Sequence, residues 1–311
     1  MRILFTGASS FTGMWFAREL AQAGHEVVAT FRQPPEAYAD AGRRQRVALA
    51  QQSCRAEIGC SFGDARFLEL VRSRSWDLLC HHGADVTNYR SPDFDPLGAA
   101  QRNSANLPAV LQALRERQCS RVLLTGSVFE NDEGAGSEGL PAFSPYGLSK
   151  AFTYQLFRHH AARAGLALGK FVIPNPFGPY EEPRFTSFLM KTWGEGKPAK
   201  VNTPAYVRDN IHVSLLAKAY AKFAARLPAA GLHFARPSGY AESQGAFTLR
   251  VAAAMRERLG LACEVELATQ AEFAEPRIRI NTEPADDGSF PWSEKAAWDE
   301  FAAFYRAAAP R

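Results

Sequence analysis

The feature that most constrains the fold is an alternation of short apolar runs and segments of helical spacing over the first 175 residues. Strands are predicted at residues 2–6, 26–30, 57–62, 76–81, 121–125 and 170–173. Between them, apolar residues recur at helical spacing over 11–23, 96–117 and 145–163, which predicts helices there. Strict strand and helix alternation predicts an α/β fold, a doubly wound parallel sheet covered on both faces by right-handed crossovers.

A glycine-bearing turn joins the first predicted strand to the first predicted helix. It reads Thr6-Gly7-Ala8-Ser9-Ser10-Phe11-Thr12-Gly13, with Ser10 where a third glycine is expected. In a Rossmann-type dinucleotide site, such glycines permit the tight turn and close helix packing, and the N–H groups at the helix start face a pyrophosphate. The residues expected at the cofactor are Gly7, Ser9, Ser10, Phe11, Thr12 and Gly13. The alternative is a plain glycine turn in a ligand-free α/β domain.

The sequence pattern changes after Pro174, where loops rich in proline and glycine replace the regular alternation of predicted strands and helices. We therefore expect a dinucleotide-binding Rossmann domain over residues 1–173 and mainly a smaller C-terminal substrate-binding lobe over 174–311, with some segments returning to the first domain. Within the second part, a helix is predicted over 209–225, because Val213, Leu216, Tyr220 and Phe223 fall on one face.

The end of the second predicted strand indicates which dinucleotide is bound. The strand ends at Thr30-Phe31-Arg32, and no acidic residue lies between Glu26 and Glu36. An acidic residue at this place would bind the ribose diol of NAD, whereas an arginine suits the 2′-phosphate of NADP. The sequence therefore favours NADP(H) over NAD(H), with Arg32 at the phosphate. The alternative is that Arg32 is a solvated loop residue.

A tyrosine and a lysine four residues apart, Tyr146 and Lys150, fall on one face of the helix predicted over 145–163. The ammonium lowers the pKa of the phenol, so the phenol can exchange a proton with a substrate oxygen while hydride moves at carbon. Ser127 follows the strand predicted over 121–125 and precedes Tyr146 by 19 residues. These three residues are the predicted catalytic group. An exposed helix pair is the alternative for Tyr146 and Lys150.

Composition and cysteine usage exclude several classes of protein. The net charge is 36 − 32 = +4, and the only dense basic cluster is Arg43, Arg44 and Arg46, so a nucleic-acid partner is not expected. The five cysteines form no C-x-x-C pair, and the paired histidines His81-His82 and His159-His160 lack further ligand spacing, so neither disulfides nor a metal are expected. With no long apolar stretch, we expect a cytoplasmic protein without a membrane partner.

Several further motifs, taken together, resemble one family. They are Gly63-Asp64, His81-His82-Gly83-Ala84, Asn103, Thr125-Gly126-Ser127, Ser144-Pro145-Tyr146-Gly147-Leu148-Ser149-Lys150, Asn175-Pro176-Phe177-Gly178-Pro179 and Arg208-Asp209-Asn210-Ile211-His212-Val213. With the glycine loop, they make the chain resemble the extended short-chain dehydrogenase/reductases of the NAD-dependent epimerase/dehydratase group over nearly its whole length.

The resemblance implies roles for the matched residues. Asp64 would bind the adenine, Gly83 and Ala84 would line the cofactor, and Asn103 belongs to the same cofactor-binding set. Lys150 would also hold the nicotinamide ribose beside Tyr146. In nucleotide-sugar members, residues matching Asn175 and Arg208 contact the substrate, the arginine gripping its diphosphate. The alternatives are that Asn175 caps a turn and that Arg208 pairs with Asp209. The resemblance also implies a homodimer.

From these residues, we expect an NADP(H)-preferring oxidoreductase acting on a hydroxyl or keto carbon of a nucleotide sugar, with a sugar 4-ketoreductase as the sharpest version. A dehydratase is disfavoured, since Ser127-Val128-Phe129 offers no acid and base pair and Glu130 is the nearest carboxylate. One alternative is an NAD-retaining nucleotide-sugar epimerase. Another is a non-catalytic dinucleotide-sensing protein.

Overall fold

The computed structural model describes residues 1–308, which divide into two compact units. The first unit comprises residues 1–133, 141–173 and 217–236, so a segment from the second half of the chain joins it. The second comprises residues 134–140, 174–216 and the described residues from 237 onward. No helix within residues 1–308 combines the length and the apolar character that a membrane span needs.

The first unit is built on a seven-stranded sheet whose paired strands all run parallel, in the order β10-β6-β5-β4-β1-β2-β3. Its strands are β1 (Arg2–Thr6), β2 (Glu26–Phe31), β3 (Arg55–Ile58), β4 (Leu78–His81), β5 (Arg121–Ser127), β6 (Ala167–Ile173) and β10 (Leu232–Ala235). The order reverses between β1 and β4, and ligands of open parallel sheets bind beyond the carboxyl ends of strands at such a point. The predicted doubly wound sheet is confirmed.

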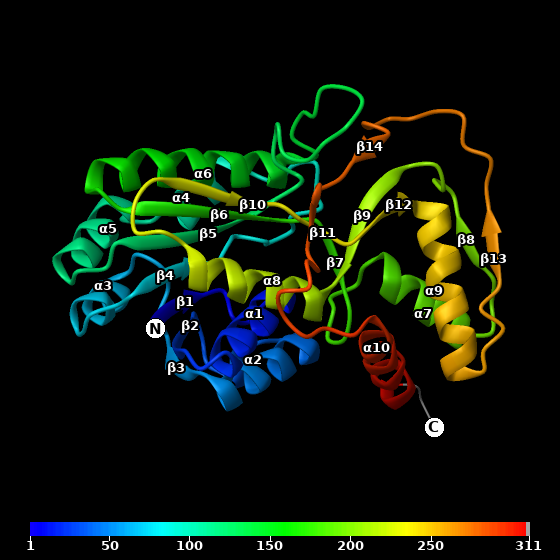
Figure 1. Cartoon of the computed structure of the whole chain (residues 1–311), viewed down its shortest axis with the longest axis horizontal. Helices are drawn as coiled ribbons and strands as arrows, with labels where there is room; N and C mark the ends of the chain where they lie inside the picture. The colour runs from blue at the N-terminus through cyan, green and yellow to red at the C-terminus, as the bar shows by residue number, and fades with distance from the viewer. Residues whose placement is uncertain (309–311) are drawn as a thin grey trace. The chain divides into compact units, whose positions relative to one another are not determined.

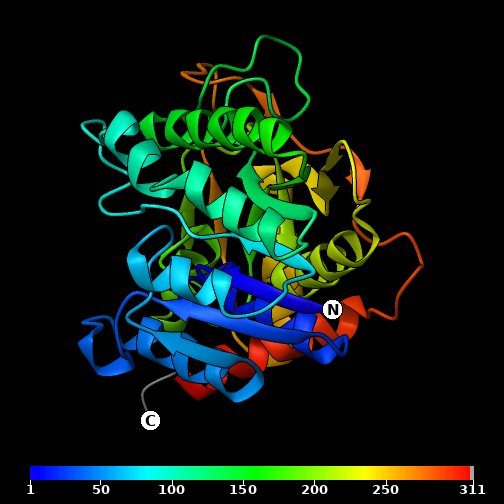
Figure 2. The same cartoon turned by 90° about the vertical axis from the view of Figure 1, so that its left-hand side faces the viewer.

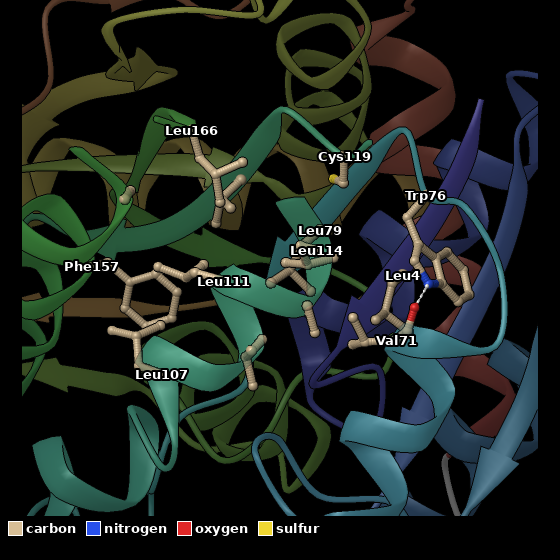
Figure 3. Packing of buried hydrophobic residues seen from close by; sticks show 14 of the residues in the cluster. Leu4, Val71, Trp76, Leu79, Leu107, Leu111, Leu114, Cys119, Phe157 and Leu166 are labelled. Atoms are coloured by element: carbon tan, nitrogen blue, oxygen red, sulfur yellow. Dashed lines mark hydrogen bonds between the residues drawn. The ribbon is translucent and has the colours of Figure 1, made fainter. Parts of the chain in front are cut away.

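Helices lie on both sides of this sheet (Figures 1 and 2). They are α1 (Phe11–Gln22), α2 (Ala41–Ser53), α3 (Ala65–Arg72), α4 (Pro96–Asn103), α5 (Leu107–Glu116), α6 (Pro145–Ala164) and the part of α8 (Val213–Arg226) that begins at residue 217, with one 3-10 turn, η1 (Pro35–Ala37). Residues from α3, α5 and α6 form a buried core with the strands, and Trp76 closes it with a hydrogen bond to the carbonyl of Val71 (Figure 3). On α1 and α8, Phe16 stacks on Tyr220.

The second unit carries smaller sheets and its own core. It contains β7 (Asn175–Phe177), α7 (Phe185–Gly194), β8 (Ala199–Val201), β9 (Val207–His212), β11 (Pro237–Ser238), β12 (Tyr240–Ser243), α9 (Gln244–Leu259), β13 (Val265–Leu267), β14 (Ile278–Arg279), β15 (Glu283–Pro284) and α10 (Glu294–Ala308). β9 is the centre of a four-stranded mixed sheet, antiparallel to β12 and parallel to β14 and β7. A buried core, with Phe177, Trp193 and Phe301 among its aromatic members, holds α7, α9 and α10 to it.

Three predicted elements differ from the structure. The helix expected over 96–117 is two helices, because Asn106 adopts a left-handed φ of 49° and the ring of Pro108 could not sit inside a continuous helix. The helix expected over 209–225 begins only at Val213, since the residues before it belong to β9. β3 also begins and ends earlier than expected, at Arg55 and Ile58.

Candidate active site

The turn between β1 and α1 requires glycine at two places. Gly7 has a φ of 88°, and a Cβ there would lie 2.6 Å from the backbone nitrogen of Gly83. A Cβ on Gly13 would lie 2.1 Å from the carbonyl oxygen of Gly7. The two glycines therefore allow the turn, the loop after β4 and the start of α1 to approach closely, and the first turn of α1 holds no acidic residue. A helix N-terminus reached by such a turn suits a dinucleotide pyrophosphate.

Ser10, which stands where a third glycine was expected, closes this turn. It is the N-cap of α1, and its Oγ accepts from the N–H of Gly13 at 3.1 Å. The same hydroxyl donates to the carbonyl oxygen of Gly7 at 2.9 Å. The departure from three glycines therefore leaves the loop intact and adds a cap.

His82 joins the glycine loop to the end of β5. Its Nε2 lies 3.1 Å from both Ser10 Oγ and Thr12 Oγ1, and its Nδ1 lies 3.0 Å from Thr125 Oγ1. Burial, followed by the nearby charge of Lys150, lowers the pKa of His82 to about 3, so the ring is neutral at neutral pH. His82 therefore links the glycine loop to β5 through hydrogen bonds, a role that the histidine pair in the sequence did not indicate.

Asn103 and Asp64, both expected at the cofactor, are engaged with protein groups. The amide oxygen of Asn103 accepts from the N–H of Asp85 at 2.6 Å, and its amide nitrogen donates to Thr153 Oγ1 at 3.2 Å. The carboxylate of Asp64 caps α3 at the N–H of Phe67. Asn103 thus holds α4 to the loop after β4 and to α6, while its contact with a cofactor stays a prediction, as does that of Asp64. Gly83 donates to Thr6 Oγ1, and Ala84 follows it.

The region after β2 contains an arginine that sequence reasoning did not assign. Arg32 is exposed directly after the strand. Arg43, in the first turn of α2, points its guanidinium at Ser9 of the glycine loop, with Nη2 3.3 Å from Ser9 Oγ, and covers the ring of Tyr38. The basic cluster in the sequence was the signal that could have found it. Positive charge therefore reaches the glycine loop from the side of β2.

The Tyr146–Lys150 face of α6 meets the carboxyl end of β5. The ammonium of Lys150 donates to the carbonyl oxygen of Thr125 at 2.6 Å, and Ser127 ends the same strand two residues later. Tyr146 lies one helical turn before Lys150 and packs against the rings of Tyr89 and Phe94. The structure thus places Lys150 on α6 beside the carboxyl end of β5, where Ser127 lies, with Tyr146 one helical turn earlier on the same helix.

Lys150 and Ser127 are both shielded from solvent. Lys150 is 4% exposed and Ser127 6% exposed. Burial lowers the pKa of Lys150 to about 8, a change that the carboxylate of Glu130 opposes and the ammonium of Lys170 reinforces. Near pH 7 the lysine is charged, so it can stabilise a phenolate on the same helix face.

In the second unit, Asn175 and Arg208 lie on neighbouring strands. Asn175 on β7 donates to the carbonyl oxygen of Asp209 at 3.1 Å. Arg208 on β9 donates to three main-chain carbonyls and to Glu275 Oε2 at 3.0 Å. The pairing of Arg208 with Asp209 that the sequence left open is wrong, because adjacent strand residues point to opposite faces and Asp209 accepts from the N–H of Gly239 instead.

Residues 3–233 match the NAD dependent epimerase/dehydratase family. The chain belongs to this family. It is therefore an enzyme that uses a nicotinamide dinucleotide, and the resemblance seen in the sequence is confirmed. No curated protein matches the chain.

Solved structures share the fold across the whole chain. UDP-glucose 4-epimerase from Thermotoga maritima, with UDP-glucose, is 16% identical, with 99% of each chain covered and a TM-score of 0.72. UDP-glucose 4-epimerase from Stenotrophomonas maltophila, with NAD and formylated UDP-arabinopyranose, is 20% identical, covers 99% of this chain and 98% of its own, and has a TM-score of 0.71. DesIV, a dTDP-glucose 4,6-dehydratase from Streptomyces venezuelae, has 20% identity, coverage of 99% and 97%, and a TM-score of 0.71.

Proposed function

We propose that the protein is a nucleotide-sugar epimerase, which oxidises a hydroxyl-bearing carbon of its substrate and then reduces the same carbon. The observation that carries this is the Lys150–Thr125 hydrogen bond, which sets the Tyr146–Lys150 face against the strand that ends in Ser127. Several similar structures are of 4-epimerases with bound UDP sugars, and this supports the epimerase over the net 4-ketoreductase that the sequence favoured.

The chain's own residues would handle the proton. The nicotinamide supplies and accepts hydride when bound. Tyr146 takes a proton from the substrate hydroxyl during oxidation and returns it during reduction, while Ser127 donates a hydrogen bond to the same oxygen. The charge of Lys150 stabilises the phenolate form of Tyr146. Because Lys150 is buried, water screens this charge weakly.

The substrate's diphosphate would be held by Arg208, with Asn175 nearby on β7. The guanidinium is planar and presents several donors, which suits phosphate oxygens. Arg208 is bound to Glu275 in the structure, so a diphosphate must replace that carboxylate. Nucleotide sugars are the ligands of similar structures, including UDP-glucuronic acid in the epimerase from Bacillus cereus.

A second candidate is an NADPH-consuming 4-ketoreductase. It is favoured by two arginines on the side where the 2′-phosphate of NADP would lie: Arg32 is exposed directly after β2, and Arg43 lies beside Ser9. An epimerase needs no net cofactor turnover, whereas a ketoreductase consumes NADPH in proportion to product. The positive charge of Arg32 and Arg43 affects only which dinucleotide binds, and Tyr146 would transfer the proton in the same way in either enzyme.

The deciding experiment begins with mass spectrometry of the nucleotide released from the purified protein. Nucleotide sugars and their 4-keto forms are then supplied while the NADPH absorbance and the product sugar are followed together. An epimerase interconverts two sugars without a net absorbance change, and a ketoreductase lowers the absorbance stoichiometrically. Tyr146→Phe should abolish either activity, whereas Tyr154→Phe, a matched change on the same helix, should retain it. If Tyr146→Phe left every activity and phenotype intact while the dinucleotide still bound, the sensor hypothesis would be favoured.

A further inference from the structure

Four charged side chains cluster inside the first unit beside the end of β5. The ammonium of Lys170, on β6, donates to Glu130 Oε2 at 2.6 Å and to Glu133 Oε1 at 2.8 Å. Arg236 completes the group by donating to Glu133 Oε2 at 3.0 Å. The side chains of Lys170 and Glu130 are only 2% and 1% exposed. Burying charges costs free energy unless each is paired, and here two cations balance two carboxylates.

Glu130 connects this cluster to the turn that carries Ser127. Its Oε1 accepts from the backbone N–H of Ser127 at 2.8 Å, and its own N–H donates to the carbonyl oxygen of Ser127 at 3.1 Å. The N–H of Phe129 donates to Ser127 Oγ at 3.2 Å. The N–H of Ser127 is therefore held by the side chain of Glu130, and its carbonyl oxygen is held by the turn that ends at Glu130.

Gly126 shows that the turn and the cluster are fitted to each other. A Cβ at this position would lie 2.6 Å from Lys170 Cε and 2.9 Å from Glu130 Oε1. Any larger residue would displace the lysine stem or the carboxylate. Glycine here thus lets Lys170 reach Glu130 directly beside Ser127.

The same carboxylate acts on Lys150. The charged and titratable groups that face Lys150 are Glu130, Lys170 and the neutral rings of His81 and His82, with Tyr146 on its own helix. The carboxylate of Glu130 favours the ammonium form of Lys150, while Lys170 disfavours it. Glu133 contacts the same Lys170 but pairs through its other oxygen with Arg236, so it is the natural comparison for Glu130.

We propose that Glu130, held by Lys170, is a positioning residue that fixes the main chain of Ser127 and sustains the positive charge of Lys150. Both of its oxygens are engaged and it is 1% exposed, so it does not act as an acid or base toward substrate. The kinetic part of this inference rests on the proposed function, in which Ser127 and Lys150 serve a hydride transfer. The electrostatic part concerns the protein alone.

The first test compares Glu130→Gln with Glu133→Gln by 13Cε NMR of the lysines, with the Lys150 signal assigned through Lys150→Arg. The glutamine at 130 can still accept from Ser127 but carries no charge. The titration midpoint of Lys150 should fall by about half a unit or more in Glu130→Gln and hold its position in Glu133→Gln. Adding Lys170→Met to Glu130→Gln should raise the midpoint again, because a like charge is removed. Equal shifts in the two single variants, or none, would overturn the proposal.

The second test replaces the ion pair with apolar residues, as Glu130→Leu combined with Lys170→Met. This variant should fold, since exchanging a buried ion pair for apolar side chains of similar size is often neutral or stabilising. It leaves the N–H of Ser127 without its carboxylate, so kcat should fall about tenfold or more while dinucleotide affinity stays within about twofold. Wild-type kcat in this variant would overturn the positioning role.

The two hypotheses can fail separately. If the wild-type protein turns over no nucleotide sugar, the proposed function fails, and the NMR titration still decides whether Glu130 sustains the charge of Lys150. If turnover is present, the alkaline limb of kcat/KM should move to lower pH in Glu130→Gln and keep its position in Glu133→Gln. A purely structural brace would lower the whole profile without moving its limbs.

Discussion

The ammonium of Lys150 donates a hydrogen bond to the carbonyl oxygen of Thr125 at 2.6 Å, which fixes the approach of α6 to β5. Because this ammonium is buried, its pKa is lowered to about 8, so the charged form is present below that pH and lost above it. As the charge disappears, Tyr146 becomes harder to ionise. We therefore expect kcat/KM to fall as the pH rises through about 8.

Removing the charge should reproduce this loss at every pH. Lys150→Met should lower kcat by about 10²–10⁴-fold, the range that positioned proton transfer contributes. Lys191→Met, a change at an exposed lysine on α7, is the matched control and should leave kcat unchanged. A steady-state pH profile of each variant provides the measurement, and a flat profile between pH 7 and about 9.5 in the wild type would contradict the assignment.

His82 should matter both for dinucleotide affinity and for stability in acid. His82→Leu removes the contacts with Ser10, Thr12 and Thr125, and since each hydrogen bond contributes about 1 kcal/mol, we expect about 3- to 30-fold weaker binding in a fluorescence titration. His159→Leu, at an exposed position of α6, is the control. Unchanged affinity in His82→Leu would show that the loop is held without this joint.

The acid effect has a defined sign. Burial holds the pKa of His82 near 3, below its ordinary value of 6.5, so the unfolded chain binds more protons between these values. Stability is therefore lost as the pH falls from about 6.5 toward 3. His82→Leu should show a smaller decrease of Tm between pH 6.5 and about 4 than the wild type, measured by thermal unfolding in matched buffers.

The sequence predicted those parts of the site whose signal is local. A side chain is excluded at Gly7 by its positive φ and at Gly13 by close backbone contacts, so the spacing of the two glycines was enough to predict the turn. Tyr146 and Lys150 are one helical turn apart, which their spacing in the sequence also predicted. The break between α4 and α5 was missed, although Pro108 was a local signal for it, because proline is disfavoured in the interior of a helix.

The parts that were missed depend on residues far apart in the chain. Lys170 reaches Glu130 across 40 residues: Lys170 lies opposite Leu124 on β5, and Glu130 is in the turn that follows β5. Arg43 reaches Ser9 across 34 residues. The strand β9 was missed because it contains buried polar residues such as Asp209 and Asn210. They break the alternation of apolar and polar residues by which a half-buried strand is recognised in a sequence. Their main-chain partners lie on β12, which is distant in the chain.

The preference for NADP(H) that the sequence favours can be tested at Arg32, after β2, and at Arg43, beside Ser9. Arg32→Asp should weaken NADPH binding about tenfold or more and leave NADH binding within about twofold, since only the former carries a 2′-phosphate. Arg43→Ala should act in the same direction. Arg55→Ala on β3 is the control, because its guanidinium pairs with Glu57. Equal affinities of the wild type for NADH and NADPH in a fluorescence titration would refute the preference.

The role of Arg208 can be tested by two substitutions with opposite effects. Arg208→Ala removes the proposed donor to the diphosphate, so KM for a nucleotide sugar should rise about tenfold or more with little change in kcat, as expected for a charge-assisted hydrogen bond worth about 1.5–3 kcal/mol. Glu275→Gln weakens the contact that a diphosphate must displace, so KM should fall. If Arg208 has only a structural role, both variants should be less stable than the wild type and should have similar KM values, because each substitution removes one partner of the same Arg208–Glu275 ion pair.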